Sequence, residues 1–154
     1  MRCRCVAMSL VPSTVPMKAR STPARTKVVA RLRDLGCVEI AVADTIGKAT
    51  PERVHAMVLA ALEEAAPGLL AGHFHDTGGM ALANVDVAWD LGLRIFDSAA
   101  GGLGGCPYAP GAAGNLGSGA LVAHFASKGI ATCINRELLA DTETMLEAMF
   151  ISER

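Results

Sequence analysis

Aromatic side chains are scarce in this chain, at 4% of the 154 residues, although apolar residues make up 51%. A core must therefore be built mainly from Ala, Val, Leu and Met. No apolar run reaches the roughly 18 residues that a membrane-spanning helix needs, so we expect no membrane partner. The net charge of −1 argues against nucleic-acid binding by bulk electrostatics.

Cysteine is too sparse for a disulfide scaffold. The five cysteines are odd in number and include no C-x-x-C pair, which favours a reducing compartment, and we expect a cytoplasmic protein. Acidic residues are missing from positions 1–33, which carry eight basic residues. Such a start can be a transit segment to the mitochondrial matrix. The alternative is a disordered or misassigned start, because Pro12 and Pro16 discourage regular structure, and residues 1–21 are assigned no element.

From about Thr22 onward, strand and helix patterns alternate. Short apolar runs predict strands over 37–43, 69–75 and 93–99. Helical periodicity and end signals predict helices that begin near 22, 51, 80, 118 and 136. Such alternation implies a parallel sheet with helical crossovers, either open and doubly wound or closed into a barrel. Composition and periodicity leave both architectures open.

Polar residues gather where two of these strands end. Asp44 follows the first strand, and Gly72-His73-Phe74-His75-Asp76 closes the second. The carboxyl ends of parallel strands are the edge where α/β folds place their chemistry. His73 and His75 are two residues apart, so a strand presents both imidazoles on one face, where they suit one divalent ion. The alternative is one structural and one solvent-exposed histidine.

A glycine-rich segment follows the third strand. Residues 101–115 contain six glycines and Cys106. Glycine lets the backbone approach a ligand closely, and a long loop in a compact domain is often functional. Cys106 is a candidate acid, base or nucleophile. A flexible linker with an inert thiol is the alternative.

Read together, several segments resemble 3-hydroxy-3-methylglutaryl-CoA lyase in sequence, order and spacing. They are Ala43-Asp44-Thr45, His73-Phe74-His75-Asp76-Thr77, Ala81-Leu82-Ala83-Asn84, Asp97-Ser98, Gly102-Leu103-Gly104-Gly105-Cys106-Pro107-Tyr108-Ala109 and Gly114-Asn115. The H-x-H-D-T element is shared with a wider superfamily that includes isopropylmalate and homocitrate synthases. The cysteine segment is narrower. Those synthases usually carry a Gly-Glu-Arg-x-Gly-Asn type segment where this chain has Ala112-Ala113-Gly114-Asn115, which favours the lyase.

The resemblance implies an α/β fold in which residues 22–150 form the C-terminal half of a (β/α)₈ barrel, with three strands. It implies that His73, His75 and Asn115 hold a divalent cation, Mg²⁺ or Mn²⁺. It also implies that Asp44, Cys106 and His73 are catalytic, with Cys106 and His73 transferring protons. The family cleaves an acyl-CoA substrate, 3-hydroxy-3-methylglutaryl-CoA, into acetyl-CoA and acetoacetate, a reaction of leucine degradation and ketone body metabolism.

The chain also departs from the family pattern. The family's fourth metal ligand is an aspartate on the first barrel strand, which has no counterpart here. Relatives often have a Thr-Glu-Asp-like stretch after the asparagine, where this chain has Gly117-Ser118-Gly119. They commonly have Tyr and Gln at the positions of Gly78 and Met80. A non-catalytic truncated half-barrel and an aldol-type acyl-CoA synthase of the same superfamily therefore stay open as alternatives.

A half-barrel also has consequences for association. Three strands leave two open edges, which can pair with other chains. We expect Ile40, Val42 and Ile95 to face the barrel interior, where they would be exposed without partner strands. The sequence therefore predicts a homo-oligomer or an aggregation-prone chain.

Overall fold

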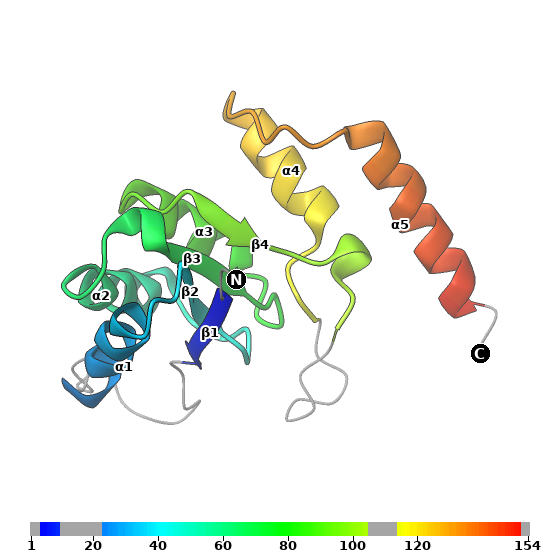
Figure 1. The fold of residues 1–154 in the computed structure, drawn as a ribbon. Coiled ribbons are helices and arrows are strands. Elements are labelled where there is room, and N and C mark those ends of the chain that lie inside the picture. Colours follow the sequence, from blue (N-terminus) through cyan, green and yellow to red (C-terminus); the bar gives the residue numbers. More distant parts are fainter. Residues whose placement is uncertain (1–3, 10–22, 105–113, 152–154) are drawn as a thin grey trace.

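The computed structural model describes residues 4–9, 23–104 and 114–151, and the fold of this part is α/β (Figure 1). Four parallel strands form one sheet in the order β1–β2–β3–β4. The strands are β1 (Arg4–Ser9), β2 (Glu39–Asp44), β3 (Leu70–Phe74) and β4 (Ile95–Asp97). The helices are α1 (Pro23–Asp34), α2 (Pro51–Leu62), α3 (Ala81–Asp90), α4 (Ser118–Ser127) and α5 (Arg136–Ile151), with short 3₁₀ helices η1 (Pro67–Leu69) and η2 (Ala100–Gly102). The predicted parallel α/β architecture is confirmed.

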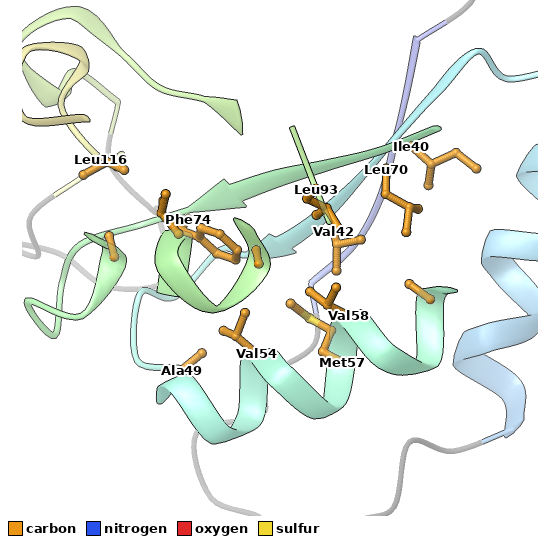
Figure 2. Packing of buried hydrophobic residues seen from close by; sticks show 14 of the residues in the cluster. Ile40, Val42, Ala49, Val54, Met57, Val58, Leu70, Phe74, Leu93 and Leu116 are labelled. Atoms are coloured by element: carbon orange, nitrogen blue, oxygen red, sulfur yellow. The ribbon is translucent and has the colours of Figure 1, made fainter. Parts of the chain in front are cut away.

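The main core lies between the sheet and its helices. Side chains of β2 and β3 point toward α2, where they meet Val54, Met57 and Val58 (Figure 2). Ile40 and Leu70 are fully buried in this layer. The core is aliphatic, with Phe74 as its largest fully buried side chain, as the scarcity of aromatic residues predicts.

The expected orientation of β2 was wrong. Ile40 and Val42 lie on the helix-facing side, with 0% and 3% of their surface exposed. The opposite side carries small residues, since Ala41 pairs in register with Ala71, and Ala43 with His73. Both sides of β2 are apolar, so alternation alone does not say which one meets the helices. Side-chain size does, because the large residues fill the layer against α2 while alanines line the other face.

The start of the chain also differs from expectation. Arg4–Ser9 form the strand β1, which pairs with β2 in parallel, so the described sheet has four strands where the sequence predicted three. The partner strand supplies the hydrogen bonds, which local composition could not reveal. Cys37 is disulfide-bonded, contrary to the reduced state expected for the cysteines. Cys133 is free.

Helix α4 is attached to the body by aromatic and ionic contacts. Phe125 packs on Trp89 of α3 and Phe96 of β4, with ring centroids 5.1 and 5.7 Å away. Asp86 of α3 accepts a hydrogen bond from His124 at 2.7 Å and pairs with Lys128. Helix α5 follows α4 and stands away from the sheet (Figure 1). Among the described residues, no helix has the length and apolar character to cross a membrane.

Candidate functional site

Strand register brings His73 and Asp97 together. His73 of β3 is the partner of Asp97 in β4, and paired residues in register project from the same face of a sheet. Oδ1 of Asp97 accepts a hydrogen bond from Nδ1 of His73. This bond raises the pKa of His73 above its ordinary value, although partial burial opposes the shift. Asp97 therefore fixes the ring and leaves Nε2 as the coordinating or proton-accepting atom.

His75 lies beside His73 at the end of the same strand. Their ring centroids are 5.3 Å apart in an edge-to-face arrangement. His75 is 8% exposed, and burial together with the neighbouring His73 lowers its pKa. A histidine with a lowered pKa is neutral at pH 7, which is the form that binds metal ions. The two imidazoles can therefore serve one centre from adjacent positions, as their spacing predicts.

Asn115, the last residue of the glycine-rich loop, lies next to His75. His75 and Asn115 form an isolated antiparallel bridge, and the amide of Leu116 donates to the carbonyl of Phe74 at 3.0 Å. Nδ2 of Asn115 donates to the carbonyl of Leu103 at 2.9 Å, which turns Oδ1 into a buried position. The structure thus brings Asn115 beside His75, and the role of His73, His75 and Asn115 as metal ligands stays a prediction.

Two glycines, Gly104 and Gly114, lie where the two ends of the glycine-rich loop approach each other. The amide of Asn115 donates to the carbonyl of Gly104 at 3.1 Å. A Cβ on Gly104, whose φ is +102°, would lie 2.7 Å from Nδ2 of Asn115, and one on Gly114 would overlap the carbonyl oxygen of Gly104. A larger residue at either position would displace Asn115. Steric contact therefore explains why both positions are glycine.

The donor atoms suit a divalent cation. Nδ1 of His75 and Oδ1 of Asn115 are two of the three buried side-chain atoms that lack a hydrogen-bond partner among the described residues. Unpaired buried polar atoms are costly, and a ligand that coordinates them removes the penalty. The described residues contain no group of three or more His, Cys, Asp or Glu that could hold a metal, and the predicted ligands are two imidazoles and one amide.

Asp44 occupies a different position from the histidines. It pairs in register with Phe74, one residue from the position that faces His73, and it is 1% exposed. Its Oδ1 accepts the amide of Gly47 at 3.0 Å and its Oδ2 the amide of Ala49 at 2.7 Å. This geometry makes Asp44 the anchor of the loop after β2, and its catalytic role stays a prediction.

The HMGL-like family model matches residues 6–146. The chain belongs to the HMGL-like family. It is 43% identical to hydroxymethylglutaryl-CoA lyase of Pseudomonas mevalonii over 122 residues, which are 79% of this chain and 40% of that protein. It is 44% identical to the cytoplasmic 3-hydroxy-3-methylglutaryl-CoA lyase of Homo sapiens over 121 residues, which are 78% of this chain and 33% of that protein.

Solved structures of HMGL-like proteins have the same fold. The HMG-CoA lyase of Brucella melitensis superposes with a TM-score of 0.83 at 40% identity, over 94% of this chain and 50% of that one. An HMG-CoA lyase of Acinetobacter baumannii, in complex with coenzyme A and 3-methylmalate, gives 0.73 at 42% identity over 79% and 40%. The chain therefore corresponds to part of a TIM barrel. It spans about 40% of the length of its first curated relative.

The HMGL-like match begins at residue 6, inside the segment 1–21 that sequence patterns left unassigned. The domain boundary expected at residue 22 stays a prediction. Cys106 lies outside the described residues, so its catalytic role is also a prediction. Asp97 is the residue that pattern reading missed. Its place at the end of a strand is visible in the sequence, but the register that pairs it with His73 is not.

Proposed function

We propose that this chain supplies the C-terminal part of a 3-hydroxy-3-methylglutaryl-CoA lyase site, which cleaves its acyl-CoA substrate into acetyl-CoA and acetoacetate. The observation that carries the proposal is the position of His75 beside both His73 and Asn115. Nδ1 of His75 and Oδ1 of Asn115 are buried and have no hydrogen-bond partner among the described residues. The relatives at 43–44% identity bear this activity in their names. The full reaction requires the part of the barrel that the chain does not match in them.

The cation, Mg²⁺ or Mn²⁺, would be held by His73, His75 and Asn115. When bound, the cation supplies Lewis-acid polarisation of the substrate's hydroxyl and carbonyl oxygens. Asp97 makes Nε2 of His73 a stronger donor, either to a cation or to a proton from the substrate hydroxyl. Cys106 is proposed as the group that returns a proton to the acetyl-CoA enolate, and Asp44 as support for the base.

The substrate class and compartment belong to the same proposal. An acyl-CoA substrate agrees with the coenzyme A bound to the Acinetobacter relative. Relatives are described as cytoplasmic in Homo sapiens and mitochondrial in Rattus norvegicus. We infer a cytoplasmic location, as in the human relative, and the mitochondrial matrix is the alternative.

The metal site can be tested by titrating the chain with Mn²⁺ in a calorimeter. The parent should show one saturable site, weaker than a complete family site because the anionic fourth ligand is missing. A His73→Ala, His75→Ala double variant should show no saturable heat. His55→Ala, which removes an exposed histidine on α2, should bind like the parent. Equal heats for the parent and the double variant would exclude the proposed centre.

A further inference from the structure

One carboxylate oxygen joins the two ends of the glycine-rich loop. The amide of Gly101 in η2, at the start of the loop, donates to Oε1 of Glu143 at 3.1 Å. The amide of Gly119 in the first turn of α4, after the loop, donates to the same atom at 2.9 Å. Glu143 belongs to α5, 24 residues beyond Gly119. A residue remote in sequence therefore ties together both ends of the segment that contains Asn115.

The lack of a side chain at Gly119 leaves room for this contact. A Cβ at residue 119 would overlap Oε2 of Glu143 and lie 3.1 Å from its Cδ. Glycine is the least favourable helical residue apart from proline, so its use inside α4 needs a reason, and room for the carboxylate provides one. A negative charge at the first turn of a helix is also favourable. Gly117-Ser118-Gly119 replaces the acidic stretch that the resemblance leads one to expect, and Glu143 brings a carboxylate there from α5.

The contact of Glu143 with Gly101 and Gly119 is linked to Asn115 through a few hydrogen bonds. On one side, the amide of Leu103 donates to Ala100 at 3.3 Å, and the carbonyl of Leu103 accepts Nδ2 of Asn115. On the other side, the amide of Ser118 donates to Ala99 at 2.8 Å. Movement of either end would therefore shift Asn115, whose Oδ1 is buried without a hydrogen-bond partner among the described residues.

We propose that Glu143 is a positioning residue, which holds Asn115 in place by clamping Gly101 and Gly119, and that Gly119 is its matched partner. The part that concerns cation binding rests on the proposed function. Glu143 touches neither substrate nor cation in this proposal, so its loss should change how well the site is formed and leave its ligands intact.

The first experiment compares Glu143→Ala with Glu143→Gln in the full chain. Both hydrogen bonds end on one oxygen, so the amide oxygen of Gln can keep them. NMR of glycine-labelled protein should show the Gly101 and Gly119 amides shifted in Glu143→Ala and near their parent positions in Glu143→Gln. The side-chain amide signals of Asn115 should follow the same order. Glu147→Ala, one helical turn further along α5 and exposed, is the matched control and should leave all of these signals unchanged.

The second readout is Mn²⁺ affinity, measured well below the melting temperature. Glu143→Ala should weaken binding about tenfold, the scale of losses when support of a ligand is removed, and Glu143→Gln should restore most of it. A merely structural role would lower the melting temperature without this split. If even the parent binds no Mn²⁺, the proposed metal centre fails, and the NMR signals of Asn115 alone decide the clamp.

The third readout is the coupling between the two partners. Gly119→Ala in the parent should lower the urea midpoint of unfolding, because the new methyl group displaces the carboxylate. In the Glu143→Ala background the same change should be neutral or raise the midpoint, because Ala is the better helix former. Additive effects of the two changes, or Asn115 and glycine signals that do not respond to Glu143→Ala, would overturn the proposal.

Discussion

At the scale of single residues, the site depends on how each histidine is held. His73 in β3 and His75, which follows β3 directly, were predicted as a pair, because a spacing of two residues brings them to one face. Asn115 was predicted only through the family resemblance, since nothing local places a residue 40 positions away beside His75. The role of Asp97 could not be predicted, because it depends on the β3–β4 register that pairs it with His73.

This contact leads to a prediction for Asp97. Asp97→Asn keeps a hydrogen-bond acceptor for Nδ1 of His73 but removes the charge, and Asp97→Ala removes both. Mn²⁺ binding should fall in the order parent, Asn variant, Ala variant, with about tenfold loss for Asp97→Ala. Calorimetry measures the affinities, and circular dichroism checks that the fold is retained. Asp90→Asn, at the exposed end of α3, should bind as the parent does, and an unchanged affinity in Asp97→Ala would show that Asp97 does not support the ring.

At the scale of elements, packing against a neighbour decides what local sequence leaves open. Strand β1 was not predicted, because its structure comes from pairing with β2. Residues 2–5, at its start, are two arginines and two cysteines, which are not a local strand signal. The helices and the three later strands were predicted, since their periodicity and glycine stops are local signals. The face of β2 was assigned wrongly, because both sides of that strand are apolar.

Gly72 gives a direct test of the packing between β3 and β4. A Cβ there would lie 2.9 Å from Cε2 of Phe74 and 2.9 Å from Cδ1 of Phe96. Gly72→Ala should therefore lower the free energy of unfolding by about 1–3 kcal/mol through overpacking. Gly68→Ala is the control, because a Cβ at Gly68 meets no atom within 4 Å. Urea denaturation measures both, and equal midpoints for the two variants would contradict this account of the β3–β4 layer.

The ion pair between α3 and α4 should make stability depend on pH. Burial tends to raise the pKa of Asp86, but hydrogen bonds from Lys128 and His124 outweigh it and hold the pKa below its ordinary value. A carboxyl with a lowered folded pKa stabilises the fold above the unfolded value of about 3.9 and loses that contribution as pH falls through the folded pKa. Asp86→Asn should therefore be less stable than the parent at pH 5, and the difference should shrink toward zero below about pH 4. Urea midpoints across this range measure it, and a difference that grows on acidification would contradict the sign.

At the scale of the whole molecule, the question is what completes the sheet. Strand order places β1 and β4 at the two ends of the described sheet. The Brucella relative has about twice this chain's matched length, since the superposition covers 50% of it. Ile40 and Val42 are already covered by α2, so the surface open to partners includes the edges of the described sheet and exposed apolar residues of α5 such as Leu138 and Met145.

These surfaces lead to the last prediction. Unpaired strand edges pair with other chains, so the isolated chain should elute as an oligomer or aggregate in size-exclusion chromatography with light scattering, and it should cleave little 3-hydroxy-3-methylglutaryl-CoA. Co-expression with the N-terminal part of the Brucella relative should cover the edges, supply the missing metal ligand, and raise both solubility and turnover. The His73→Ala, His75→Ala double variant separates the two effects, because its edges are intact and it should gain solubility without turnover. A monodisperse monomer that melts cooperatively and cleaves the substrate alone would show that the half-barrel is sufficient, since neither edge pairing nor a fourth ligand would then be required.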